Sequence, residues 1–192
     1  MAPTLASWVT SPFAVAPPTD LSVPPSLPDP AVLTGIYETH APAVRRFLRG
    51  LLGNASLADD GAQETFVRAF RRLHTLRDRG CLRPWLFGIA RLVAMELCRA
   101  RGRFCSDGAA PEAAARDTPE STLLGEETAR IVADALAALS DDRRAALLLR
   151  VDHGLSYDEI AEAMGWSIAK AKIEVHRARL ALRARLDDGG SP

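Results

Sequence analysis

Basic side chains gather near the end of the sequence, within residues 168–186. The segment carries Lys170, Lys172, His176, Arg177, Arg179, Arg183 and Arg185. Such side chains donate hydrogen bonds to phosphate oxygens and to the acceptors of guanine, so a helix that presents them can contact DNA. The chemistry that this segment indicates is nucleic-acid binding.

The residues around this segment predict the turn that would present it. Ser156 and Glu159 form an S-x-x-E capping box at the start of a short helix. Gly165 supplies the positive φ that ends this helix, and Ser167 caps a second helix that extends to about Leu186. A cationic helix that follows a short helix across a glycine turn is typical of a DNA-binding helix-turn-helix.

At 100° per residue, the second helix divides into a buried face and an exposed face. The buried face is expected to contain Ile168, Ala171, Val175, Ala178, Leu182 and Leu186. The opposite side carries Ala169, Lys170, Ile173, His176, Arg177 and Leu180, with Lys172, Arg179 and Arg183 on one flank. Glu174 either accepts a hydrogen bond from cytosine or lies outside the contact patch. An amphipathic helix with a merely solvated basic side is the alternative interpretation.

The formal net charge of the 192 residues is zero, but the charges are segregated along the chain. Residues 31–103 carry a net +7, residues 104–141 a net −6, and residues 142–186 a net +3. Two basic blocks separated by an acidic spacer indicate two surfaces that face polyanions. An arginine-rich surface without such a role is the alternative.

Helical periodicity also dominates the first basic block. A helix is expected to begin near Asp29, with Pro42 marking either a first turn or a bend between two helices. Ser56 and Asp59 resemble a capping box at the start of the next helix. This helix and a third one, which opens at a proline, are expected over about 57–76 and 84–101.

Apolar residues of these two helices are expected to face a core. They are Ala62, Phe66, Ala69, Phe70 and Leu73 of the second helix, and Trp85, Ile89, Leu92, Val93 and Leu97 of the third. Trp85 can be read as a stacking platform for bases or as a core residue, and its place near the start of an amphipathic helix favours the core.

These patterns predict an all-α protein with two small helical domains joined by a flexible acidic linker, the second domain being the helix-turn-helix. No useful length of sequence alternates with period two, so strands are not expected. Residues 1–30 contain eight prolines, and residues 104–121 lack an apolar period. The expected boundaries are a disordered tail over 1–30, domains over 31–103 and 122–188, and a linker over 104–121.

Neither catalysis nor a metal or cofactor site is predicted. The sequence contains no nucleophile–base set and no phosphate-binding glycine loop. Cys81, Cys98 and Cys105 are odd in number and lack CxxC spacing, so neither disulfides nor zinc are expected. No apolar run reaches the roughly 18 residues of a membrane span. A cytoplasmic protein without membrane insertion fits these features.

The sequence resembles the extracytoplasmic-function sigma factors of bacteria, which are two-domain initiation factors of RNA polymerase. The segments that carry the resemblance are YETHAPAVRRFLRGLLG, DDGAQETFVRAFRRLH, LRPWLFGIARLVAMELCRARGR, LAALSDDRRAALLLRVDHGLSYDEIAEAMGW and SIAKAKIEVHRARLAL. The resemblance implies binding to core RNA polymerase, and promoter recognition, DNA melting and initiation at a narrow promoter set. It also implies an anti-sigma factor as a partner.

Roles for individual residues follow from the same resemblance. It assigns polymerase binding to Asp60, Gln63, Glu64 and Phe66. It assigns capture of the −10 strand to Arg79, Arg83, Arg91 and Arg99. It assigns reading of the −35 duplex to Lys170, Lys172, Ile173, His176, Arg177 and Arg179. The chain departs from the usual family residues at Gly61, Leu92, Ala169 and Glu174, which is expected to alter promoter choice more than fold.

Two other functions remain open. A helix-turn-helix regulator with an N-terminal sensory bundle would act without polymerase, but it does not explain the +7 charge of residues 31–103. A sigma-like protein that binds polymerase or an inhibitor without initiating shares every feature described above.

Overall fold

The computed structural model describes residues 29–76, 78–100 and 131–189. Every regular element in these ranges is a helix, as expected for an all-α protein. The expected linker, and the expected tail apart from its last two residues, lie outside them.

The N-terminal half contains three long helices: α1 (Pro30–Leu52), α2 (Ala55–Arg72) and α3 (Leu82–Ala100). Two short 3-10 turns, η2 (Leu73–Thr75) and η3 (Arg79–Cys81), connect α2 to α3. The Asp29 carboxylate accepts from the Ala31 amide at 2.9 Å and so caps α1. Helix α1 continues through Pro42, and both expectations for this proline are therefore wrong. Pro42 lies on the exposed side, where the carbonyl that loses its donor can bond water.

The start of α2 also differs from the expected Ser56–Asp59 capping box. Gly53, with φ 64°, ends α1 in the left-handed conformation, and Asn54 follows in an extended one. The Asn54 side chain accepts from the Leu57 amide at 2.9 Å, so Asn54 is the N-cap and Ser56 already lies inside the helix. Asparagine caps helices as well as serine does, and the glycine before it fixes where the chain can turn.

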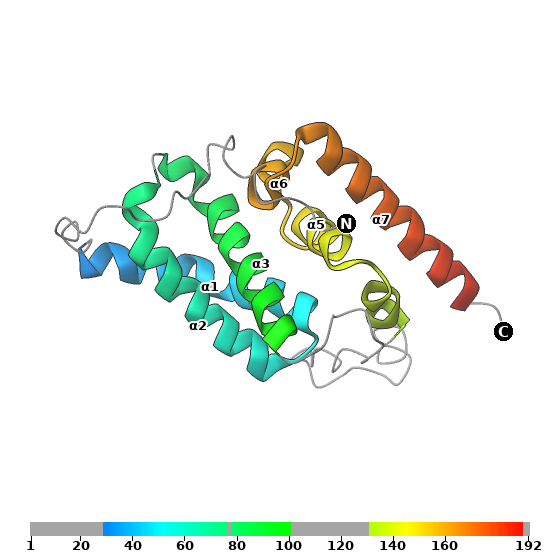
Figure 1. The fold of residues 1–192 in the computed structure, drawn as a ribbon, viewed down its shortest axis with the longest axis horizontal. Coiled ribbons are helices and arrows are strands. Elements are labelled where there is room, and N and C mark those ends of the chain that lie inside the picture. Colours follow the sequence, from blue (N-terminus) through cyan, green and yellow to red (C-terminus); the bar gives the residue numbers. More distant parts are fainter. Residues whose placement is uncertain (1–28, 77, 101–130, 190–192) are drawn as a thin grey trace.

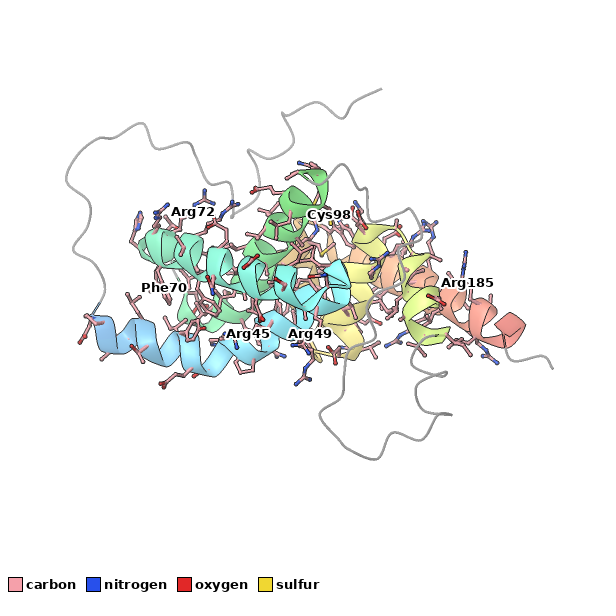
Figure 2. All side chains as sticks on the ribbon, turned by 90° about the horizontal axis from the view of Figure 1, so that it is seen from below. Arg45, Arg49, Phe70, Arg72, Cys98 and Arg185 are labelled. Atoms are coloured by element: carbon pink, nitrogen blue, oxygen red, sulfur yellow. The ribbon has the colours of Figure 1, made fainter. Side chains whose placement is uncertain are left out.

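The C-terminal half contains α5 (Asp141–Val151), α6 (Tyr157–Met164) and α7 (Ile168–Gly189), preceded by a helical segment over 131–137. Helix α5 contacts α1, α6 contacts α3, and α7 lies along the far side against α5 and α6 (Figure 1). Arg72 of α2 and Arg185 of α7 lie toward opposite ends of the molecule (Figure 2).

The two halves share one continuous apolar core. Its fully buried side chains come from both, and include Phe47, Leu48, Phe87, Leu149, Leu155 and Ile160. Helices α3 and α6 approach closely at Gly88, where an added Cβ would lie 3.1 Å from the carbonyl oxygen of Ala163. Gly50 of α1 lies against the side chain of Leu148 of α5, whose Cδ1 would be 2.8 Å from an added Cβ. The described structure is therefore a closed arrangement of the two halves.

Cys81 is a free thiol, whereas Cys98 is disulfide-bonded. The expectation of no disulfide is wrong for Cys98, because an odd count of cysteines leaves room for one pair. Within the described ranges, no group of three or more His, Cys, Asp or Glu side chains could hold a metal ion. No helix in these ranges is long and apolar enough to cross a membrane.

Candidate nucleic-acid interface

The turn between α6 and α7 is built by the expected caps. Ser156 Oγ accepts from the Glu159 amide at 3.2 Å, and Glu159 Oε2 accepts from the Ser156 amide at 2.7 Å, which completes the capping box. Gly165 ends α6 with φ 65°. Ser167 Oγ then accepts from the Lys170 amide at 3.2 Å at the start of α7. The predicted helix-turn-helix geometry is confirmed.

Helix α7 packs through small residues on its inner face. Ala171, Val175 and Ala178 are fully buried against α5 and α6, as predicted, and Leu182 is half-buried. Ile168, expected on the same face, is 46% exposed. It stands at the first position of α7, directly after the turn. Because these side chains are short, α7 packs close to α5 and α6.

The outer face of α7 presents the candidate DNA-binding residues to solvent. All six are exposed, and Ile173 is 50% exposed; the set is Lys170, Lys172, Ile173, His176, Arg177 and Arg179. Two of the lysines lie over aromatic rings. The Lys170 amine lies 4.6 Å from the centre of the Trp166 ring, and the Lys172 amine lies 5.9 Å from the centre of the Tyr157 ring. Cations above aromatic faces are attracted by the ring quadrupole, so these contacts hold both lysines near the turn.

Unlike those six exposed residues, Glu174 of the same helix has a side chain that is only 17% exposed. Its Oε2 accepts from Arg143 Nε of α5 at 2.8 Å, and its Oε1 accepts from Arg177 Nη1 at 3.1 Å. The hydrogen bond from Arg143 is the main reason that the pKa of Glu174 lies below its ordinary value. The carboxylate therefore links Arg143 of α5 to Arg177 of its own helix, and its oxygens already accept from two arginines. Sequence reasoning missed Arg143, which lies 31 residues away.

The candidate −10 arginines do not share one environment. Arg91 Nη2 donates to Asp142 Oδ1 of α5 at 2.6 Å, and the Arg91 side chain is 12% exposed. Arg83 donates to the backbone carbonyl of His153, between α5 and α6. Arg99 is exposed near the end of α3, and the side chain of Arg79 lies outside the described residues. Two of the four arginines thus bond to the C-terminal half.

His153 lies at the centre of this junction. Its ring contacts those of Phe47 and Phe87, with centre separations of 5.8 and 4.8 Å, and the residue is 8% exposed. Burial is the main cause that lowers the pKa of His153; nearby Arg46 and Arg83 lower it further, and Asp152 opposes them. A neutral imidazole therefore fills the space between the halves.

The candidate polymerase-binding residues lie on α2. Asp60, Gln63 and Glu64 are exposed on its surface. Phe66 is 3% exposed, and its ring packs 4.9 Å from that of Tyr37. Phe66 therefore occupies the core, as its periodicity predicted, and in this closed form supports the helix from inside instead of touching a partner.

Arg68 links α2 to α3 beside the exposed residues of α2. Its guanidinium bonds Glu64 at 2.7 Å and Glu96 of α3 at 2.7 Å. Hydrogen bonding to Arg68 is the main cause that lowers the pKa of Glu96. The pair of bonds fixes the orientation of Glu64. No motif in the sequence singled out Arg68.

Trp85 and Leu92 of α3 were both predicted to face the core, but only Trp85 is buried. Trp85 is 8% exposed and belongs to the core, so the preferred interpretation is confirmed. Leu92 was expected on the core face but is 38% exposed. It lies between Arg91 and Val93, which face inward, and occupies the exposed side of α3.

Both halves of the chain match models of known protein families. The family model Sigma-70 region 2 matches residues 36–104, and the model Sigma-70, region 4, matches residues 129–182. RNA polymerase sigma factor YlaC of Bacillus subtilis is 30% identical over 155 residues, which cover 79% of this chain and 90% of the relative. ECF RNA polymerase sigma factor SigL of Mycobacterium tuberculosis is 32% identical over 165 residues, which cover 83% of this chain and 92% of the relative.

Two solved structures have the same fold. The sigma factor RpoE from Bartonella quintana, in complex with the anti-sigma factor NepR, superposes with a TM-score of 0.67 at 28% identity, over 81% of this chain and 97% of that one. CnrH, in complex with the cytosolic domain of CnrY, gives a TM-score of 0.63 at 24% identity, over 85% and 92% of the two chains.

Proposed function

This chain belongs to the extracytoplasmic-function sigma factors of bacterial RNA polymerase, and from this premise we propose which of its residues carry each part of the activity. A sigma factor binds core polymerase and directs it to promoters, where DNA melts and transcription begins. Members of the family are initiation factors, not enzymes, and we assign this chain no catalytic residue. The assignment rests above all on the six exposed residues of α7, presented across a fully capped helix-turn-helix.

Helix α7 reads the −35 element in the major groove. Lys170, Lys172, Arg177 and Arg179 contact phosphates or guanine edges, and His176 can do either. Ile173, which is 50% exposed between basic side chains, suits the methyl group of thymine. Helix α6 then crosses the DNA backbone, as the first helix of this motif does in other DNA-binding proteins.

The −10 strand is captured around η3 and the adjacent helix α3, through Arg79, Arg83, Arg91 and Arg99. A melted strand needs cations that track its backbone. Arg83 and Arg91 must first give up the His153 carbonyl and Asp142, so the closed arrangement has to open before the strand can bind.

Core polymerase binds the exposed side of α2 through Asp60, Gln63 and Glu64, with Phe66 holding the helix in place from the core. The two functional units correspond to residues 31–103 and 122–188, joined by the acidic segment 104–121. Tight promoter binding requires polymerase to hold both units at a fixed spacing, because each alone contacts only one short element.

An anti-sigma factor is the proposed regulatory partner, and the cytoplasm is the proposed location. The support is the similarity to RpoE and CnrH, whose solved structures are complexes with NepR and with the cytosolic domain of CnrY.

Binding of sheared DNA from the encoding genome, by the free chain and by its holoenzyme, tests the proposal. We expect the holoenzyme to retain a small set of fragments that the free chain does not enrich. A helix-turn-helix regulator that acts without polymerase would instead enrich the same fragments with and without core. That outcome would replace the proposal.

A further inference from the structure

Glu174 is an acidic residue among the basic and apolar side chains of residues 168–186 in α7. Its carboxylate joins two arginines, one on the neighbouring helix and one on the DNA-facing side of its own helix. Arg143 Nε lies 2.8 Å from Oε2, and Arg177 Nη1 lies 3.1 Å from Oε1. The Arg177 side chain is otherwise 57% exposed.

We propose that Glu174 determines specificity by positioning Arg177: it fixes the guanidinium for reading one base and lowers attraction to DNA of any other sequence. The proposal rests on the function proposed for α7. Glu174 itself need not touch DNA, since it acts through Arg177.

The geometry supports positioning because Glu174 is anchored independently of Arg177. An exposed arginine on a helix samples many rotamers, and a lone surface carboxylate would move with it. The bond to Arg143 of α5 ties the carboxylate to a second helix, and only 17% of the Glu174 side chain is exposed. The carboxylate is thus a fixed acceptor three residues before Arg177, within reach of its guanidinium.

The charge supports the second half of the proposal. A carboxylate beside a DNA-reading arginine offsets part of its attraction to phosphate, which every sequence offers equally. Bidentate hydrogen bonds from arginine to the O6 and N7 of guanine depend on orientation and distinguish bases. An anchored carboxylate therefore favours the oriented contact over the unoriented one.

A purely structural role makes a different prediction. If Glu174 only tied α7 to α5, its loss would weaken binding to all sequences, as would the loss of Arg143. Positioning predicts opposite changes in specific and non-specific binding, confined to the base that Arg177 reads.

The test uses holoenzyme made with the full chain and a promoter library randomised over the −35 element. Glu174→Gln keeps the shape of the side chain and removes its charge. We expect the preference at one −35 position to fall about tenfold, the loss of one oriented arginine contact. Binding to random-sequence DNA is expected to rise about twofold to threefold, because one negative charge is gone.

Two further variants make the result decisive. Arg177→Ala should remove the preference at the same position, and the double variant should then show no additional loss there, since Glu174 acts through Arg177. Asp158→Asn on α6 removes the same charge from an exposed residue. It is expected to leave the preference at that position unchanged.

Three results would overturn the inference. They are an unchanged preference in Glu174→Gln, a loss spread evenly over all positions, and a further loss in the double variant. A wild-type holoenzyme that selects no −35 element at all would instead refute the proposed function, and the inference with it.

Discussion

Arg91 of α3 and Asp142 of α5 lie 2.6 Å apart, Nη2 to Oδ1, and join the two halves of the chain across 51 residues of sequence. The same arginine belongs to the set expected to hold the −10 strand. In the proposed function, this one side chain serves either the contact between the halves or the promoter, so we expect the balance between closed and open forms to affect activity.

Asp142→Asn should shift that balance toward the open form. The substitution keeps an oxygen that can accept from Arg91 but removes the negative charge beside its guanidinium, whose side chain is 12% exposed. Because Asp142 is half exposed, we expect a loss of about 1 kcal/mol or less in closure. Binding of a single-stranded −10 oligonucleotide by the free chain should rise by up to about fivefold, measured by fluorescence anisotropy. Asp134→Asn, an exposed carboxylate of the same half, is the charge-matched control, and an equal rise in this control would refute the explanation.

Gly88→Ala should separate α3 from α6. The new Cβ would meet the carbonyl oxygen of Ala163 at 3.1 Å, and backbone on both sides leaves little room to adjust. We expect a loss of about 1–3 kcal/mol in the free energy of unfolding, measured by urea titration. Gly35→Ala in α1 is the control, since nothing lies within 4 Å of its Cβ, and it should stabilise the chain by about 0.5–1 kcal/mol. Equal effects of the two substitutions would contradict this packing.

Acid should lower the free energy of unfolding through His153. Burial lowers the pKa of this imidazole from its ordinary value of 6.5, and Arg46 and Arg83 add to that shift while Asp152 opposes it. The unfolded chain therefore binds a proton before the folded chain does, and His153 contributes stability above pH 6.5 that is lost as pH falls toward its folded pKa.

The slope of unfolding free energy against pH, below pH 6.5, measures this contribution. His153→Gln should flatten the slope, whatever it does to the absolute stability. His40 also has a lowered pKa, mainly from burial, so a residual slope is expected in the variant. A slope that His153→Gln leaves unchanged would show that this residue does not titrate with unfolding.

Ser156→Ala should damage the helix-turn-helix specifically. The substitution leaves the Glu159 amide without its acceptor and breaks the capping box. We expect a loss of about 1 kcal/mol in unfolding free energy. Ser140→Ala at the start of α5 is the matched control, because the Ser140 side chain makes no capping bond there, and it should cost much less. Equal costs, by thermal or urea unfolding, would show that the capping box contributes nothing special.

Local sequence features predicted much of this structure. The caps and the positive-φ glycine around α6 and α7 act within a few residues, and the buried Ala171, Val175 and Ala178 follow directly from the helical period. The period fails at Ile168, the first residue of α7, and at Leu92 of α3, which are both exposed although it placed them on the core face.

Contacts between distant residues could not be predicted in the same way. The pairs Arg91–Asp142 and Arg143–Glu174 are separated by 51 and 31 residues, and no period or motif relates them. A net charge counts every arginine alike, so the net charges of the two basic blocks did not reveal which arginines are exposed and which join helices.

Run-off transcription with bacterial core polymerase, on a library of fragments from the encoding genome, tests the central claim most directly. With this protein added, we predict new discrete start sites, each preceded by the same two elements at constant spacing. A folded chain that adds no start site to a competent core polymerase would contradict the claim that its two basic faces act together as a sigma factor.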